Sequence, residues 1–429
     1  MRKMKDSGIE WIGEIPEGWE IVPVRSCFDE VRTKNTDGQE QNALQFKSGN
    51  IISKANFNAN IDDYVADTIT NYTVVLPDTV MINGLNLNYD FKSLRVALVK
   101  EKGVITPAYL AIFPDRKKIF PQYATYLFKG YETKMAFHNM GAGIRKTLGY
   151  KEFKNQPLLL PSKEEQNKIS AYLDSKCSHI DIMLSKIRSS IEEYKKLKQA
   201  VITQAVTKGV RGEREMRDSG VEWIGKIPKE WVIQKIKSIS SRINVGVVIR
   251  PSEYFDENGT VPFLRGINVK EYLISSDNMV YINESSNHIL SKSQVHTDDI
   301  LIVRDGSIGT SCVVPAEYDG ANVVSMVIVT PSTSCDSRFI CYSLNSDVGK
   351  TQFTLTKIGS ALTHTSVSAV SDIIVAVPSC AEQKEIADYL DAKCAEIDGL
   401  IAKKEQLVKE LESYKKSLIY EVVTGKREV

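Results

Sequence analysis

An internal repeat constrains this chain more than any other feature of its sequence. Two framework blocks occur twice: residues 4–21 match 216–233, and residues 158–209 match 375–426 without gaps. Between them lie residues 22–157 and 234–374, which share little sequence with each other. A period above roughly 200 residues is too long for a solenoid and indicates duplication of a whole domain with its connector. The chain therefore alternates a copied framework with a variable unit, and a pseudo-two-fold axis is the simplest relation between the halves.

The first framework block holds all four tryptophans of the chain, Trp11 and Trp19 in one copy and Trp223 and Trp231 in the other. Each copy ends in an Ile-Pro-x-x-Trp segment, and Pro16 is expected to keep the first copy extended. A residue that recognised different ligands in the two halves should not be identical in both. We therefore interpret the segment as a docking clip, whose indole rings anchor each variable unit by packing.

The second framework block predicts a long helix in each copy. Apolar residues recur at spacings of three and four, no proline occurs from 162 to 227 or after 378, and a Ser-x-x-Glu capping box opens each copy. A helix over 163–206 would be roughly 65 Å long. Such a seam needs a partner, so we expect the two helices to pair as a coiled coil. Seam lysines such as Lys198 favour an exposed pair, and two amphipathic helices in one core are the alternative.

The variable units combine strand and helix patterns. Apolar, β-branched runs cut by Gly or Asp predict strands at 42–51, 72–84, 95–103, 261–269, 298–314 and 322–330. Short helices are expected at 119–138 and 337–352. Each unit closes with a glycine-bearing polar loop followed by an apolar strand, over 140–161 and 358–378.

These patterns predict an α+β protein. Two mixed α/β domains would be joined by two long antiparallel coiled-coil helices. The expected boundaries are 1–157 for the first domain, 158–212 for the central helical region, 213–374 for the second domain and 375–429 for the C-terminal helical region.

Several function classes find no support in the sequence. No P-loop or Asn-Pro-Pro-Tyr methyltransferase motif occurs, the five histidines lack metal-ligand spacing, and the seven cysteines form no Cys-x-x-Cys pair. We therefore expect no catalytic residues, no metal site and no disulfides. No apolar run is long enough for a membrane span and no signal peptide is evident, so a cytoplasmic location is the default expectation. The formal net charge of +1 gives no hint of a polyanionic partner.

Each predicted helix opens with Glu-Gln-x-x-Ile, starting at Glu165-Gln166 and at Glu382-Gln383, and each variable unit follows an Ile-Pro-x-x-Trp segment. This doubled order resembles the specificity subunit of type I restriction-modification systems. In that family, two variable target-recognition domains alternate with two repeated regions. The resemblance covers essentially the whole chain and places Gln166 and Gln383, like the four tryptophans, in the structural framework.

The resemblance implies a non-catalytic protein that recognises double-stranded DNA. Such a subunit gathers two methyltransferase subunits and two motor-endonuclease subunits onto a bipartite, asymmetric target. Adenine methylation with S-adenosylmethionine and cleavage with ATP and Mg²⁺ belong to those partners, so no cofactor is expected on this chain. Each recognition domain would read one half-site, and the paired helices would set the length of the unread spacer.

Candidate base-reading residues are polar side chains in or near the glycine-containing loops of the variable units. Arg and Lys suit the O6 and N7 atoms of guanine, and Asn suits N6 and N7 of adenine. The candidates are Lys47, Asn50, Lys54, Asn86, Asn88, Lys92, Arg145 and Lys146 in the first unit, and Arg265, Asn268, Lys270, Arg304, Lys357, Thr363 and His364 in the second.

Two rival functions remain open at the level of sequence. One is a structural adaptor that holds two non-nucleic-acid binding modules on a coiled coil. The other is a self-contained metal-dependent nuclease, for which the Asp-x-Lys triplet at Asp115 is the only hint. The same triplet recurs at Asp174 and Asp391 within the predicted helices, so the nuclease signal is near background.

Overall fold

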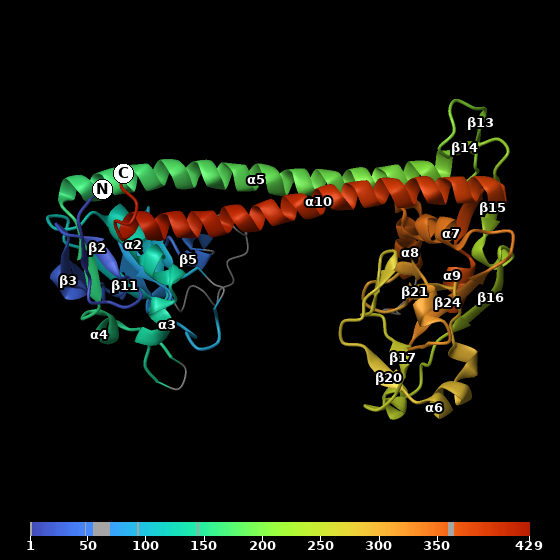
Figure 1. Ribbon diagram of the computed structural model, residues 1–429, viewed down its shortest axis with the longest axis horizontal. Helices are drawn as coiled ribbons and strands as arrows, with labels where there is room; N and C mark the ends of the chain where they lie inside the picture. Colours follow the sequence, from blue (N-terminus) through green and yellow to red (C-terminus); the bar gives the residue numbers. More distant parts are fainter. Residues whose placement is uncertain (1, 48, 55–68, 92–93, 144–145, 359–363) are drawn as a thin grey trace. The chain divides into compact units, whose positions relative to one another are not determined.

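The structure, a computed structural model, describes residues 2–47, 49–54, 69–91, 94–143, 146–358 and 364–429. The chain divides into two compact units. Unit 1 consists of residues 1–188 together with 405–429, and unit 2 consists of residues 189–404. Two long helices, α5 (Lys163–Lys208) and α10 (Cys380–Val423), each contribute residues to both units (Figure 1).

Unit 1 is built from short strands and short helices. Its strands are β1 (Met4–Asp6), β2 (Glu14–Pro16), β3 (Glu20–Pro23), β4 (Phe28–Glu30), β5 (Leu44–Lys47), β6 (Asn50–Ser53), β7 (Thr73–Val75), β8 (Val80–Ile82), β9 (Val96–Leu98), β10 (Gly103–Ile105), β11 (Leu110–Pro114) and β12 (Pro157–Leu160). The short helices in its described part are α2 (Pro121–Thr133), α3 (Ala136–Met140) and α4 (Tyr150–Phe153).

Unit 2 also combines short strands with short helices. Its strands are β13 (Met216–Asp218), β14 (Lys226–Pro228), β15 (Val232–Lys235), β16 (Ser240–Val245), β17 (Val261–Leu264), β18 (Val269–Lys270), β19 (Leu273–Ile274), β20 (Val280–Ile282), β21 (Ile300–Val303), β22 (Ser311–Val313), β23 (Asn322–Val323), β24 (Met326–Pro331) and β25 (Ile374–Val377). Its short helices are α6 (Glu284–Ile289), α7 (Ser337–Asn345), α8 (Asp347–Ile358) and α9 (Val367–Ser371).

The central sheets of the two units have the same strand order, although their sequences differ. In unit 1 the order is β4-β11-β8-β9, and in unit 2 it is β16-β24-β21-β22. All of these neighbours pair antiparallel. The final strand of each unit, β12 or β25, pairs antiparallel with the strand that follows the docking clip, β3 or β15. Each variable unit is therefore closed by a strand from its beginning and a strand from its end.

The two long helices run antiparallel within each unit. In unit 1, Lys415 of α10 forms an ion pair with Asp181 of α5 at 2.6 Å. In unit 2, Lys198 of α5 pairs with Asp398 of α10, also at 2.6 Å. The expected antiparallel pairing is thus confirmed, and these seam lysines reach carboxylates on the opposite helix. The ends of the long helices are also buried in the domain cores. Ile169, near the start of α5, belongs to the core of unit 1.

Both helix starts use only one half of the expected capping box. The hydroxyl oxygen of Ser162 accepts the backbone N–H of Glu165 at 3.3 Å, and Ser379 accepts that of Glu382 at 3.4 Å. The carboxylate of Glu165 instead accepts the indole N–H of Trp19 at 2.9 Å. The helix cap is therefore linked directly to the docking clip.

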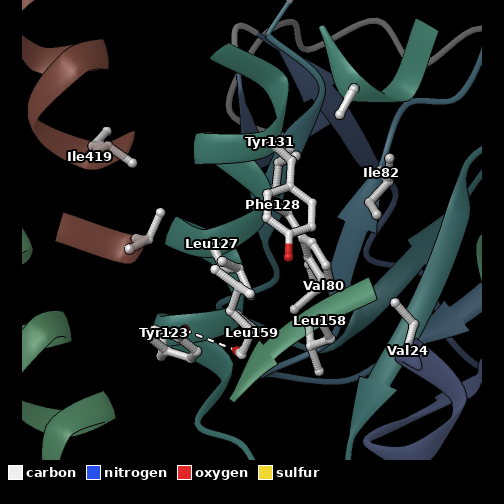
Figure 2. Packing of buried hydrophobic residues seen from close by; sticks show 14 of the residues in the cluster. Val24, Val80, Ile82, Tyr123, Leu127, Phe128, Tyr131, Leu158, Leu159 and Ile419 are labelled. Carbon is white, nitrogen blue, oxygen red and sulfur yellow. Dashed lines mark hydrogen bonds between the residues drawn. The ribbon is translucent and has the colours of Figure 1, made fainter. Parts of the chain in front are cut away.

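The core of unit 1 combines the clip, the sheet and both long helices. Figure 2 shows Phe128 of α2 beside Val80 of β8, with Ile419 of α10 nearby. The hydroxyl of Tyr123 donates to the backbone carbonyl of Leu159 at 3.0 Å, which satisfies the buried phenol. Leu173 of α5 and Ile419 of α10 belong to the same cluster, so the variable unit and the helical framework share one core.

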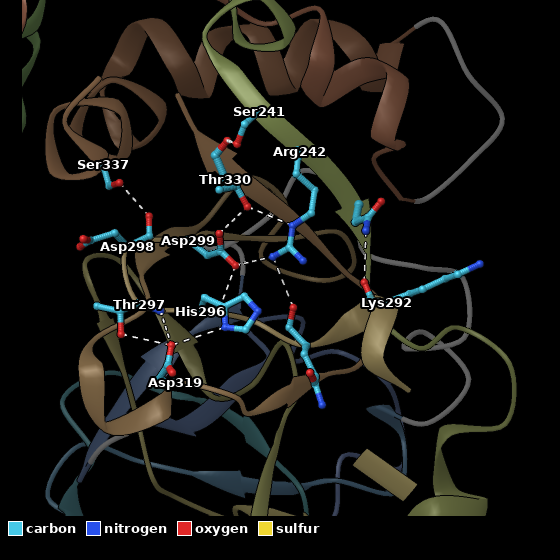
Figure 3. Close-up of polar contacts among 12 residues, drawn as sticks. Ser241, Arg242, Lys292, His296, Thr297, Asp298, Asp299, Asp319, Thr330 and Ser337 are labelled. Carbon is cyan, nitrogen blue, oxygen red and sulfur yellow. Dashed lines mark hydrogen bonds and ion pairs between the residues drawn. The ribbon is translucent and has the colours of Figure 1, made fainter. Parts of the chain in front are cut away.

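Unit 2 contains a buried ionic link across its central sheet. Asp299 is 1% exposed, and its carboxylate pairs with the guanidinium of Arg242 at 2.6 Å (Figure 3). The same carboxylate accepts hydrogen bonds from the Thr330 hydroxyl and the backbone N–H of His296. A buried carboxylate needs several donors to offset its lost hydration. Arg242 is therefore a structural residue of the sheet.

The secondary structure follows the sequence-based predictions in element type, but several boundaries differ. The helices expected at 119–138 and 337–352 are present, but each is divided in two. The strand expected over 261–269 ends at Leu264, because the following residues turn away from the sheet. The hairpin of β1 and β2 was not anticipated within the first framework block, where an extended segment was expected.

Candidate functional site

The hairpin loops at the same edge of the two central sheets are structurally equivalent. Residues 83–95 connect β8 to β9 in unit 1, and residues 304–310 connect β21 to β22 in unit 2. Both loops contain candidate base-reading residues, although the first loop is longer. The two sheets have the same strand order, and each presents a different loop at the equivalent position.

Three loops meet around the hairpin loop of unit 1. The backbone N–H of Leu87 donates to the carbonyl of Lys146 at 3.0 Å, and that of Leu148 donates to the carbonyl of Gly84 at 2.9 Å. A Cβ at Gly84 would lie 2.5 Å from the Leu148 carbonyl oxygen, so only glycine permits this approach. At Gly49, in the turn between β5 and β6, a Cβ would lie 3.0 Å from the side chain of Leu94. We call the surface formed by the described residues of these loops, 47, 49–50, 83–91, 94–95, 141–143 and 146–148, the unit 1 loop surface.

A comparable set of loops meets in unit 2. Arg304 donates from Nε to the carbonyl of Thr365 at 3.0 Å, and the Thr365 backbone N–H donates to the carbonyl of Arg304 at 3.1 Å. A Cβ at Gly266 would lie 3.4 Å from Val303. Residues 265–268, 304–310 and 364–366 therefore form the unit 2 loop surface. In both units, described residues of the loop before the closing strand hydrogen-bond to the hairpin loop of the sheet.

Most described candidates of the first unit belong to the unit 1 loop surface. Lys47, Asn50 and Lys146 are exposed there, and Asn86 is exposed in a left-handed conformation with φ of 53°. Asn88 is half-buried in the same loop. The remaining candidates are placed elsewhere or not described: Lys54 lies at the end of β6 with its Nζ 5.7 Å from the ring centroid of Tyr72, and Lys92 and Arg145 lie outside the described residues.

The candidates of the second unit are more dispersed. Arg265 and Arg304 are half-buried on the unit 2 loop surface, where His364 is also half-buried. Lys270 is exposed at the end of β18. Lys357 is part of the last turn of α8, and Thr363 lies outside the described residues.

Asn268 has a different role from the one expected. Its side chain is 0% exposed. The amide oxygen accepts the backbone N–H of Arg265 at 3.0 Å, and the amide nitrogen donates to the carbonyls of Ser275 and Asp277. A fully buried amide with these partners cannot reach a base edge. Asn268 instead holds the loop that presents Arg265, and this bend ends β17.

Arg95, which the sequence did not single out, supports the hairpin loop of unit 1. Its side chain is 1% exposed, and Nη1 donates to the carbonyls of Asn83 and Leu85 at 2.9 Å each. Nη2 donates to the carbonyl of Asp90. One guanidinium group therefore fixes both ends of the loop segment that carries Asn86. No local sequence pattern distinguishes such an arginine from a surface cation.

The charge of each unit limits how it can attract an anion. Residues 20–157 contain 18 Lys and Arg against 14 Asp and Glu, a net charge of +4, whereas residues 232–374 contain 11 against 14, a net charge of −3. In unit 2, Arg338 forms ion pairs with three aspartates, and Lys235 and Lys237 share Asp372. Arg304, by contrast, donates to a backbone carbonyl. Its charge therefore remains available on the unit 2 loop surface.

The framework glutamines make the same contact in both units. Gln166 is 0% exposed, and its Oε1 accepts the backbone N–H of Phe120 just before α2 at 2.9 Å. Gln383 is 1% exposed and accepts the backbone N–H of Asp336 just before α7, also at 2.9 Å. Each glutamine thus ties the start of a long helix to a helix of the variable unit.

The tryptophans of the docking clips are not equivalent in their surroundings. Trp19 and Trp231 are each 1% exposed and belong to the cores of their units. Trp11 packs edge-on against Tyr131 with ring centroids 4.7 Å apart, whereas Trp223 is 38% exposed. Three of the four rings are therefore packed against other residues, as the docking-clip interpretation expects, whereas Trp223 is exposed.

The described residues offer no arrangement suited to catalysis by a metal ion. Within the residues placed by the structure, no group of three or more His, Cys, Asp or Glu side chains is arranged so that it could hold a metal ion. Asp115, the hint of a nuclease, caps a turn: its carboxylate accepts the backbone N–H of Lys117 at 2.9 Å, which lowers the pKa of Asp115. None of the helices in the described chain combines the length and apolarity needed to cross a bilayer.

Comparison with known proteins gives a consistent result. Residues 228–410 match the type I restriction modification DNA specificity domain. The putative type I restriction enzyme MjaX specificity subunit of Methanocaldococcus jannaschii is 24% identical over 97% of this chain and 95% of its own length. The MjaVIII specificity subunit of the same organism is 24% identical over 96% of this chain and 93% of its own length.

A solved structure shares the fold. It comes from work on complex assembly and conformational transition of the type I R-M system, and it matches 96% of this chain and 99% of its own with a TM-score of 0.70 at 14% identity. The doubled framework, the two equivalent sheets and the full-length relatives agree with one another. The chain is therefore similar over nearly its whole length to type I restriction enzyme specificity subunits, and residues 228–410 match their DNA specificity domain.

Proposed function

We propose that this chain is the DNA-recognition subunit of a type I restriction-modification complex. One observation carries the proposal: two units with the same sheet order present unrelated loop surfaces from the same position. A conserved scaffold with different polar loops is the arrangement expected of two readers that recognise two different half-sites. Each unit reads one half of a bipartite, asymmetric target in double-stranded DNA.

Base recognition would rest on a few polar side chains of the two loop surfaces. Asn86 and Lys146 in unit 1 and Arg304 in unit 2 carry groups that can hydrogen-bond base edges in the major groove. The net charge of −3 in residues 232–374 argues against a large contribution from phosphate contacts by unit 2 alone. Additional phosphate contacts would come from partner subunits, since phosphate contacts position a protein while base contacts specify the sequence.

The chemistry of the complex would belong to its partners. Two methyltransferase subunits would use S-adenosylmethionine for adenine methylation, and two motor-endonuclease subunits would use ATP and Mg²⁺. This chain would bind no cofactor and contribute no catalytic residue. Its site of action would be cytoplasmic DNA.

Exchange of one variable unit tests the proposal. Residues 234–374 are replaced by the corresponding unit of another family member, and the methylated sequences are mapped in cells that contain the methyltransferase partner. We expect one half-site to change and the other to stay the same, because each loop surface belongs to a single unit. A change of both half-sites would contradict the two-reader arrangement.

Two assays on the purified chain distinguish the proposed function from the rival functions. An adaptor for proteins or glycans would not shift DNA in the presence of the methyltransferase partner. A self-contained nuclease would cleave DNA when the purified chain is incubated with Mg²⁺, and this cleavage would be lost in Asp115→Asn. We expect a DNA shift with the partner and no cleavage by the chain alone.

A further inference from the structure

The hairpin loop of unit 1 carries two large aromatic side chains that face solvent. Tyr89 is 70% exposed and Phe91 is 56% exposed. Aromatic rings of this size are usually buried over much of their surface, because their transfer from water is favourable. Two such rings on one polar loop indicate that the loop acquires a partner that offers flat apolar surface.

The loop is held in position without that partner. The buried guanidinium of Arg95 binds the carbonyls of Asn83, Leu85 and Asp90. The carbonyl of Asn86 accepts the backbone N–H groups of Tyr89 at 3.1 Å and Asp90 at 3.0 Å. Side chains on such a loop lose little conformational entropy on binding, which favours their use as fixed contacts.

One of the two rings is already part of a stack. The rings of Phe91 and His138 lie 5.0 Å apart at an interplanar angle of 10°. His138 is fixed in turn, because its Nε2 lies 3.1 Å from the carbonyl oxygen of Asp90. Phe91 therefore has one face supported from within the protein, while more than half of its surface remains open.

The polar surroundings of the two rings favour a nucleic acid over an apolar protein surface. Lys47, Asn86 and Lys146 are exposed on the same unit 1 loop surface. Residues 20–157 have a net charge of +4, from 18 Lys and Arg against 14 Asp and Glu. Nucleobases combine a flat π face with a polyanionic backbone, so they complement rings surrounded by cations and amides.

We propose that Tyr89 and Phe91 stack on bases of the DNA half-site recognised by unit 1 and stabilise an unstacked base step there. The inference rests on the proposed DNA-binding function and adds a contact that reads deformability as well as base edges. The equivalent loop of unit 2, residues 304–310, contains no aromatic residue. The distortion would therefore occur in only one of the two half-sites.

Base stacking can be measured with 2-aminopurine, whose fluorescence rises when it unstacks. The full chain is assembled with its methyltransferase partner on duplexes of the mapped target. 2-Aminopurine is placed at purines that are not methylated, in each half-site in turn. We expect increased fluorescence at one step of the half-site read by unit 1, and no such step in the other half-site.

Variants of the exposed ring provide a matched comparison. Tyr89→Leu keeps an apolar side chain but removes the ring, and it should abolish the fluorescence increase and weaken DNA binding about tenfold. Tyr89→Phe keeps the ring and should behave as the unchanged protein does. Phe91→Leu should reduce the signal in the same direction. Thermal unfolding of Tyr89→Leu serves as the folding control, and its midpoint should be unaltered at so exposed a position.

Three other outcomes would contradict base stacking by Tyr89 and Phe91, and they can be told apart. Unchanged fluorescence and equal affinity of Tyr89→Leu, with specific binding by the unchanged protein, would refute stacking and leave the proposed function intact. Absence of any sequence preference in the unchanged protein would refute the proposed function as well. Weaker association of Tyr89→Leu with the methyltransferase subunit in the absence of DNA would identify the rings as a protein contact.

Discussion

Identical residues in the two framework copies make different contacts. Trp19 donates its indole N–H to Glu165 at 2.9 Å. In both copies the glutamate also forms an ion pair with the equivalent arginine, Arg2 with Glu165 and Arg214 with Glu382, but the buried indole nitrogen of Trp231 has no hydrogen-bond partner among the described residues. The duplication has thus preserved the ring and its arginine in each core, whereas the indole hydrogen bond is present for Trp19 and absent for Trp231 among the described residues.

This difference predicts unequal effects of the same substitution at the two tryptophans. Trp19→Phe should lower the free energy of unfolding of unit 1 by about 1–3 kcal/mol, because it removes a hydrogen bond to a carboxylate. Trp231→Phe should have a smaller effect on unit 2 or even a stabilising one, because it removes a buried donor without a partner. Hydrogen exchange resolved by unit measures both. A larger loss for Trp231→Phe than for Trp19→Phe would show that the polar contacts do not decide stability here.

The sequence placed most candidate readers in glycine-containing loops. Lys47, Asn86, Lys146 and Arg304 all lie on the two loop surfaces, and their role in base reading stays a prediction. Asn268 was wrong as a reader, because burial is a property of the folded loop and not of the local sequence. Arg95 was missed for the same reason.

At the level of elements, α2 connects the framework to the hairpin loop of unit 1. It carries Glu132, whose carboxylate accepts the backbone N–H of Arg95 next to the loop. Burial raises the pKa of Glu132 to about 7, and the hydrogen bond from Arg95 and the charge of Lys129 only partly oppose this effect. A carboxyl with a raised pKa in the folded state makes stability fall as pH rises from its unfolded pKa, near 4.5, to about 7.

Glu132→Gln should flatten that pH dependence. The unchanged protein should lose about 1–3 kcal/mol of unit 1 stability between pH 4.5 and 7, because the unfolded chain releases the proton before the folded chain does. The glutamine variant cannot ionise and should lose less over the same interval. Thermal midpoints across this pH range provide the measurement, with Glu10→Gln as an exposed control. Parallel pH profiles for both variants and the unchanged protein would contradict the raised pKa.

Element types were more predictable than their boundaries. The two long helices follow from seam spacing and from the absence of proline, and these are local properties of the sequence. The division of the helix expected over 119–138 depends on Met135, which adopts a left-handed conformation with φ of 52°. Neither this residue type nor its neighbours indicate such a break. The equivalence of the two sheets could not be predicted, because it rests on non-local strand pairing between unrelated sequences.

At the level of the whole molecule, α5 and α10 are the only elements of the described chain that contribute to both units. In the proposed function their length would set the spacer between the half-sites. The pairs Arg188 with Glu412 and Lys198 with Asp398 fix the helix register in unit 1 and unit 2 respectively. Residues 189–197 and 399–411 lie between these pairs.

Shortening both helices by one heptad tests the spacer. Deletion of seven residues within 189–197 and seven within 399–411 preserves the seam while shortening each helix by about 10 Å. We expect the spacer in the methylated sequence to shorten by about three base pairs, with both half-sites unchanged. Replacement of the same residues by an unrelated heptad of equal length is the control. An unaltered spacer in the deletion variant would exclude the helices as the determinant of that distance.

The two units also differ in how their cores depend on chain order. Unit 2 is formed by one continuous stretch, residues 189–404, whereas unit 1 is completed by residues 405–429. In unit 1 the hydroxyl of Tyr420 donates to the carbonyl of Trp11 at 2.7 Å, and Lys426 donates to the carbonyl of Ile12 at 2.6 Å. During translation, unit 2 can therefore reach its final form before unit 1, although unit 1 begins first. The first domain to be translated is the last to be finished.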